Sequence, residues 1–156
     1  MGALFLLPAI IAAWVLGALG VTPIGAESSD EFAETTMRWM MFMAVGIMFL
    51  VSGTMHTAFA KSTAESIGWK TNGFQYEIGF VSWGLGIAGI VAATMGNDAW
   101  IVVSIVTSVF LVLAGVYHVV EMVREKNFNP GNSMILFYDF GLPISLWILL
   151  LMVYAV

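Results

Sequence analysis

Five ionisable side chains interrupt apolar stretches of the sequence, and their types suit chemistry inside a membrane. Each lies close to one end of a long apolar run, at a similar distance from that end. Ionisable groups are costly inside a bilayer, so such residues are treated first as a functional site. The five are two histidines and three carboxylates: His56, Glu77, His118, Glu121 and Asp139.

Two imidazoles and up to three carboxylates suit a transition metal such as Fe, Zn or Mn better than Ca²⁺ or Mg²⁺. His118 and Glu121 share a helix face, a spacing related to that of di-metal carboxylate bundles, although the order of the two residues is reversed. Two histidines and one carboxylate would leave coordination positions open. The sequence therefore predicts metal binding, in a redox enzyme or in ion or proton handling. It indicates neither haem nor a nucleotide, assigns no catalytic residue, and leaves open whether the protein is an enzyme.

A non-catalytic role is the alternative, as an accessory or structural subunit of a larger membrane complex. Buried His–Glu and Asp–Tyr hydrogen bonds also fix the packing of membrane helices. Groups that converge around open space would favour chemistry, whereas dispersed groups paired with neighbouring helices would favour the accessory role. Pro143 bears on this choice because it removes the helix partner of the Asp139 carbonyl. That carbonyl would be an ion ligand in the first case and part of a simple kink in the second.

The elements that must position these residues are membrane helices. The chain of 156 residues is 60% hydrophobic and 10% charged, which is too apolar for a soluble domain of this size. We expect an all-α, polytopic bundle of about five transmembrane helices in a single domain, 1–156. The first apolar run lacks a basic n-region and a good cleavage site, so we expect a helix there rather than a signal peptide. The runs are 3–21, 37–60, 74–95, 100–123 and 134–156.

Basic residues predict the orientation of this bundle. With five helices, the connections 61–73 and 124–133 lie on one side with the N-terminus, and they contain four of the five Lys and Arg residues. The positive-inside rule then places that side, and the polar ends of the last four runs, in the cytoplasm. We expect a multi-pass protein of a prokaryotic inner (cytoplasmic) membrane. The connection 61–73 should contain a short interfacial helix, with a capping box at Ser62 and Glu65 and a stop at Gly68.

Two stripes of small or polar residues predict helix packing. In run 74–95 the stripe should pack within the chain, against a second copy or against other membrane subunits. In run 100–123 the stripe should donate hydrogen bonds between helices rather than line a path. The sequence has no basic patch, so nucleic acid is not an expected partner, and the lipid bilayer is. The first stripe is Gly79, Ser82, Gly86, Gly89 and Ala93, and the second is Ser104, Ser108, Gly115 and His118.

Two groups of motifs resemble those of a family of small prokaryotic integral membrane proteins of unknown function. The first is Ile67-Gly68-Trp69 followed by Phe74-Gln75-Tyr76-Glu77-Ile78-Gly79. The second is Tyr117-His118 followed by Asn127, Asn129-Pro130-Gly131-Asn132, Tyr138-Asp139 and Pro143. The resemblance covers about residues 40–155. A proline precedes the Phe-Gln pair in that family, where this chain has Gly73. The resemblance implies the fold and a membrane location, and it carries over no activity.

Overall fold

Residues 6–155, the part of the chain that this computed structural model describes, form helices and contain no strand. Four segments are long and apolar enough to cross a membrane: Phe32–Thr57, Gly73–Ala93, Asn97–Arg124 and Pro130–Tyr154. The shortest has 21 residues, and a helix of that length rises by about 30 Å, the thickness of the hydrocarbon core. The predicted all-helical, multi-pass membrane bundle is therefore confirmed. Its helices are α1 (Leu7–Ala18), α2 (Phe32–Trp39), η2 (Met40–Ile47), α3 (Met48–Thr57), α4 (Ala60–Ile67), α5 (Gly73–Ala93), α6 (Asn97–Arg124), α7 (Pro130–Ser133) and α8 (Leu136–Tyr154).

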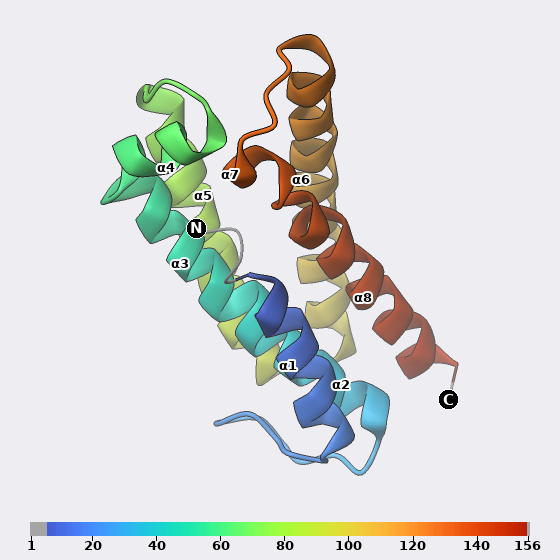
Figure 1. Cartoon of the computed structure of the whole chain (residues 1–156). Helices are drawn as coiled ribbons and strands as arrows, with labels where there is room; N and C mark the ends of the chain where they lie inside the picture. Colours follow the sequence, from blue (N-terminus) through green and yellow to red (C-terminus); the bar gives the residue numbers. More distant parts are fainter. Residues whose placement is uncertain (1–5, 156) are drawn as a thin grey trace.

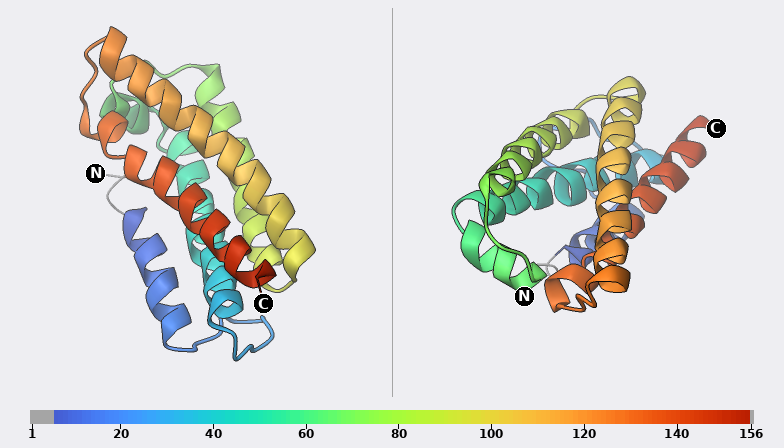
Figure 2. Two further views of the ribbon diagram at one scale, coloured as in Figure 1. Left: turned by 90° about the vertical axis from the view of Figure 1, so that its right-hand side faces the viewer. Right: turned by 90° about the horizontal axis from the view of Figure 1, so that it is seen from above.

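The long helices form two antiparallel pairs. The segment from η2 to α3 packs against α5, and α6 packs against α8 (Figures 1 and 2). The short helices α4 and α7 contact each other at one end of the bundle, shown at the top of Figure 1. The connection between α1 and α2 lies at the opposite end. The connection within each pair, which contains α4 in the first pair and α7 in the second, therefore lies at this same end of the bundle.

The first helix is shorter than the sequence predicts. Over the described residues, α1 has 12 residues, which rise by about 18 Å and do not cross a bilayer. It packs against α2, η2 and α8, and Trp14 donates a hydrogen bond to the Ser145 hydroxyl of α8 at 3.3 Å. Over residues 6–155 the structure thus has four helices long and apolar enough to span a membrane, and one shorter apolar helix, where about five spans were expected.

Small residues set the distance between α5 and the segment from η2 to α3. A Cβ atom on Gly86 would lie 2.8 Å from the backbone nitrogen of Leu50 and 2.9 Å from the Gly46 carbonyl oxygen. A Cβ atom on Gly89 would lie 2.7 Å from the Gly46 nitrogen. The stripe predicted in run 74–95 is therefore used for packing within the chain. Contact of this helix with other subunits stays a prediction.

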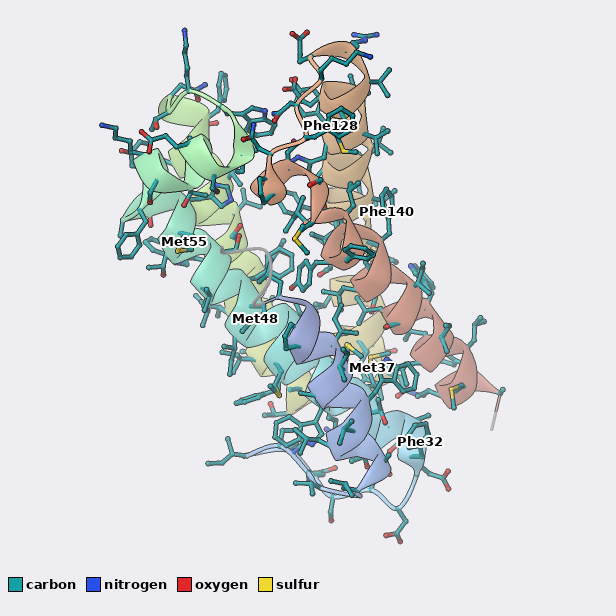
Figure 3. All side chains as sticks on the ribbon, in the orientation of Figure 1. Phe32, Met37, Met48, Met55, Phe128 and Phe140 are labelled. Carbon is teal, nitrogen blue, oxygen red and sulfur yellow. The ribbon has the colours of Figure 1, made fainter. Side chains whose placement is uncertain are left out.

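A π-helical segment, η2, continues α2 into α3 within one membrane span. Such wide turns are rare and leave backbone carbonyls available to other partners. The Ala44 carbonyl of η2 accepts a hydrogen bond from the Tyr138 hydroxyl of α8. Met40 and Met41 of the same segment are fully buried in the core. The labelled side chains of Figure 3 show Met37 and Met48 at successive levels of this span.

Candidate functional site

The connection after α4 directs Trp69 back toward the bundle. Gly68 ends α4 with a φ of +89°, as the sequence predicts, and the Trp69 nitrogen then donates to the Ala64 carbonyl at 2.8 Å. The predicted capping box is wrong, because α4 begins at Ala60 and Ser62 lies inside it. The Ser62 hydroxyl instead donates to the carbonyl of Phe59 at 3.0 Å.

Asparagines fasten the connection after α4 to the connection after α6. Asn127 Nδ2 donates to the Ile67 carbonyl at 2.8 Å, and Asn129 Nδ2 donates to Asn127 Oδ1 at 2.7 Å. A Cβ atom on Gly68 would lie 2.4 Å from Asn129 Nδ2, so the asparagines pack directly on that glycine. The rare polar residues of these two connections thus form one structural unit.

His118 is fixed in a single tautomer by Asn132 of α7. Asn132 Nδ2 donates to the carbonyls of His118 at 3.2 Å and Asn127 at 2.8 Å. The amide oxygen of Asn132 must therefore face His118 Nδ1, which lies 2.7 Å away and must carry the proton. The Nε2 atom of His118 is then the nitrogen with a free lone pair, and it has no hydrogen-bond partner within residues 6–155.

His56 of α3 is paired in a different way. Gln75 Nε2 of α5 lies 2.9 Å from His56 Nδ1. An amide nitrogen can only donate, so Nδ1 of His56 accepts and Nε2 of His56 carries the proton. His56 lies near the end of α3 and His118 near the end of α6, where the connections that contain α4 and α7 begin. The structure thus brings the two predicted histidines to the same end of the bundle, on opposite helix pairs.

Glu121 is tied to Trp69. Its Oε2 atom accepts a hydrogen bond from Trp69 Nε1 at 3.1 Å. The indole stacks on His118 with ring centroids 5.4 Å apart and planes 11° apart, and Tyr117 meets it edge-on at 5.8 Å. Trp69 therefore links the histidine and the carboxylate that the sequence places on one face of α6.

Glu77 and Asp139 lie apart from this group. Glu77 is exposed on the outer face of α5. Asp139 is buried at 2% exposure beside α6, where a Cβ atom on Gly115 would lie 3.0 Å from its Cβ atom. Its Oδ2 atom has no hydrogen-bond partner among the described residues. Pro143 lies inside α8, which continues to Tyr154.

Three of the five residues, His56, His118 and Glu121, are therefore paired with other partners, while Glu77 is exposed and Asp139 is buried apart from them. Within residues 6–155, no three His, Asp or Glu side chains are placed so that they could hold a metal ion together. Metal binding at His56, Glu77, His118, Glu121 and Asp139 stays a prediction. The pairing of His56, His118 and Glu121 with neighbouring elements is the arrangement expected for the alternative, non-catalytic role.

An open pocket of about 740 Å³ lies beside these pairs, between the start of α5 and the end of α6. This volume is typical of small-molecule sites. Two lysines, two glutamates and three aromatic rings line it, together with apolar and amide groups. The lining residues are Gly68, Trp69, Lys70, Asn72, Phe74, Gln75, Ile78, Tyr117, Glu121, Glu125, Lys126, Asn127 and Asn129.

Gln75 connects the pocket with the histidine pair. Its side chain is 4% exposed, lines the pocket, and uses its Nε2 atom on His56. Its Oε1 atom has no hydrogen-bond partner in the described part of the chain and, unlike the enclosed Oδ2 atom of Asp139, it is accessible to solvent. A ligand that displaces this solvent must supply a donor, because an amide oxygen left unpaired is costly. This oxygen therefore offers an acceptor to a bound molecule.

The pocket was not predicted, although its residues carry a signal in the sequence. Gln75 and Tyr117 are polar residues close to the ends of apolar runs, as the five ionisable residues are.

Ser108 of the second stripe accepts a hydrogen bond from Trp147 Nε1 of α8 at 3.1 Å. Ser108 thus takes part in a hydrogen bond between helices, as an acceptor rather than as the predicted donor, while the Ser104 hydroxyl has no partner among the described residues.

Comparison with known proteins assigns a family and no activity. No curated protein and no solved structure matches the chain. A family described as "Family of unknown function (DUF6790)" matches residues 3–156. The match includes both helix pairs, the two fastened connections and every residue that lines the pocket. The chain therefore belongs to the DUF6790 family, whose function is unknown.

Proposed function

We propose that the protein binds an amphipathic small molecule at the membrane–water interface, in the pocket between α5 and α6. Gln75 carries this proposal, because it lines the pocket and its accessible Oε1 atom has no hydrogen-bond partner among the described residues. In this role the protein is a non-catalytic binding or accessory component of the membrane. The pairing of its polar groups with neighbouring elements supports that role.

The place of the pocket supports an amphipathic ligand. Its polar lining comes from the connections after α4 and α6, at the end of two membrane spans. Phe74, Ile78 and Tyr117 form its apolar part, and Phe74 is 71% exposed on the outer surface of α5. A ligand can therefore keep a polar group among the loops and an apolar group along the lipid-facing side of the helices.

The charge distribution supports a cytoplasmic pocket. Lys61, Lys70, Arg124 and Lys126 all belong to the end of the bundle that contains α4 and α7. The fifth basic residue, Arg38, is buried in the first membrane span. By the positive-inside rule the pocket would face the cytoplasm. In a prokaryotic cell this corresponds to the inner (cytoplasmic) membrane.

Native mass spectrometry of the detergent-purified protein tests this proposal. The wild type should retain an added mass of lipid-like size. Ile78→Trp fills the pocket from α5 and should abolish retention, whereas Phe80→Trp changes an exposed apolar side chain of the same helix outside the pocket. Equal retention in both variants, or none in the wild type supplied with membrane lipids, would overturn the proposal.

Metal or proton handling by the two histidines is a second candidate function. The free Nε2 atom of His118 supports it, because a histidine that donates from Nδ1 to a fixed acceptor is the usual form of a metal ligand. His56 would supply a second ligand once its Nδ1 atom is released by Gln75, because its Nε2 atom carries the proton in the paired state. A metal ion would take its remaining ligands from water or from the bound molecule.

Metal content tests this second candidate. A near-stoichiometric Fe, Zn or Mn that is lost in both His118→Ala and His56→Ala, and kept in Glu77→Gln, would support it. A wild-type protein that holds no metal after reconstitution would reject the metal form. The Glu77→Gln variant is the matched control because Glu77 is exposed and separate from both histidines.

A further inference from the structure

We infer that the ligand of this pocket is a zwitterion with a phosphodiester and a primary ammonium group, as in the phosphoethanolamine headgroup of a lipid. This inference rests on the proposed binding function of the same pocket. It adds which charges the ligand carries and which residues recognise each of them.

The pocket has charged groups of both signs in equal number. Lys70 and Lys126 supply two positive charges, and Glu121 and Glu125 supply two negative charges. No ion pair joins these four side chains within residues 6–155. Charges that line a cavity without neutralising one another are available to a ligand. A ligand with a single charge would neutralise either the lysines or the glutamates and leave the other pair uncompensated. A zwitterion can place a negative group beside the lysines and a positive group beside the glutamates.

The acceptors in the pocket point to an ammonium group that still carries N–H donors. Gln75 lines the pocket and its accessible Oε1 atom has no partner among the described residues, and Glu121 uses only its Oε2 atom on Trp69. A primary ammonium has three N–H donors and can satisfy both oxygens, with the ring of Tyr117 or Trp69 as a further contact. A quaternary ammonium has no N–H donor and would leave these oxygens unsatisfied. The pocket therefore selects a primary amine over a choline group.

The lysines supply the opposite side of the site. Lys126 lies in the connection after α6 with a φ of +56°, a left-handed backbone conformation that residues other than glycine rarely adopt. The connection that contains it is fastened by the neighbouring asparagines, and Lys126 lines the pocket with Lys70. Lysine ammonium groups bind phosphate oxygens as point charges. The two lysines therefore bind the phosphodiester.

A lipid is the source that the apolar wall favours over a soluble phosphodiester. Phe74 and Tyr117 line the pocket and are 71% and 52% exposed on the surface of the spans. They continue the pocket toward the acyl region of the bilayer. A soluble glycerophosphoethanolamine has the same headgroup without a group for this wall, so the two sources can be distinguished by experiment.

The test is competition for the full-length protein in nanodiscs that contain phosphatidylethanolamine, phosphatidylcholine or phosphatidylglycerol, with bound lipid measured after mild extraction. We expect phosphatidylethanolamine to be retained about tenfold over the other two, since one charge-assisted contact is worth about that factor. Glu121→Gln keeps an acceptor for Trp69 and removes the charge, so it should abolish the preference over phosphatidylglycerol. Lys126→Gln should weaken retention of all three lipids. Glu77→Gln should change nothing.

The outcomes separate this inference from the proposed function. Retention of phosphatidylcholine equal to that of phosphatidylethanolamine would overturn the assignment of a primary ammonium group. Preference for phosphatidylglycerol would overturn the assignment of a zwitterion. Either result would leave lipid binding itself in place. Retention of none of the three would overturn the proposed function as well. Soluble glycerophosphoethanolamine that protects the protein against heat as well as the lipid does would support the headgroup and overturn the lipid as its source.

Discussion

His118 and Asn132 hold each other in one orientation across two helices. Nδ1 of His118 lies 2.7 Å from Oδ1 of Asn132, and the amide nitrogen of Asn132 donates to two backbone carbonyls. Asn132 is fully buried, and these three contacts satisfy its side-chain oxygen and both N–H groups inside the protein. The pair fastens α7 to α6 and leaves Nε2 of His118 as the only ring nitrogen free to accept.

Asn132→Leu should destabilise the protein strongly. The change leaves the Nδ1–H group of His118 and the Asn127 carbonyl without their partner, and each orphaned buried group costs about 1–3 kcal/mol. Thermal unfolding in detergent measures the loss. His118→Phe combined with Asn132→Leu removes one of the two orphaned groups, so it should recover part of the stability. An Asn132→Leu variant as stable as the wild type would contradict the hydrogen bonds assigned to Asn132.

Gly86 and Gly84 of α5 should respond in opposite directions to alanine. Gly86→Ala places a Cβ atom 2.8 Å from the Leu50 backbone nitrogen, and such overpacking costs about 1–3 kcal/mol. Gly84 has open space around it, so Gly84→Ala should stabilise the helix by about 0.5–1 kcal/mol. Unfolding of both variants under the same conditions checks the difference. Equal effects would mean that α5 does not pack on η2 and α3 as described.

The sequence predicts the spans well because they depend on run length and apolar content, which are local properties. It fails for α1, whose apolar run is long but whose helix has 12 residues over the described part. It also misses η2, because nothing in the residues 40–47 distinguishes a π turn from an α turn. The contacts of η2 are tertiary: it packs against α5, and its Ala44 carbonyl accepts from Tyr138 of α8.

The site was harder to predict because side-chain direction depends on tertiary contacts. Glu77 and Gln75 lie two residues apart at the start of α5, so they point to different faces of one helix. The neutral Gln75 faces His56, and the charged Glu77 faces outward. Ranking residues by charge selects Glu77, whereas the helix contacts select Gln75. The sequence does place the two histidines at the same end of the bundle, because depth along a span can be counted in the sequence.

Arg38→Met should destabilise the protein although it removes a charge from the bundle. Arg38 is 6% exposed, and its guanidinium donates to the carbonyls of Ala93 at 3.0 Å and Met95 at 2.8 Å, where α5 ends. It also lies 5.2 Å from the ring of Trp100. Helix C-terminal carbonyls stabilise a cation, so the arginine is held without a carboxylate.

We expect Arg38→Met to cost about 2–4 kcal/mol, from two charge-assisted hydrogen bonds and the contact with the indole. Arg38→Lys keeps the charge and can keep one carbonyl contact, so it should lose about half as much. Thermal unfolding of the two variants measures both values. An Arg38→Lys variant that is no more stable than Arg38→Met would show that the charge at the end of α5 is unimportant.

Gly73→Pro should stabilise the start of α5 and thereby the wall of the pocket. Gly73 is the first residue of the helix, where proline is favoured because its missing N–H needs no partner. Asn72 before it is extended, with φ −149° and ψ −177°, as a residue before proline requires, and its side chain accepts from the Phe74 nitrogen. No atom lies within 4 Å of a Cβ atom at position 73.

We therefore expect Gly73→Pro to raise the free energy of unfolding by about 0.4–1 kcal/mol, since proline restricts the unfolded chain. Gly73→Ala is the control, because it fills the same space without fixing φ. A proline variant less stable than the alanine variant would show that α5 begins at a different residue.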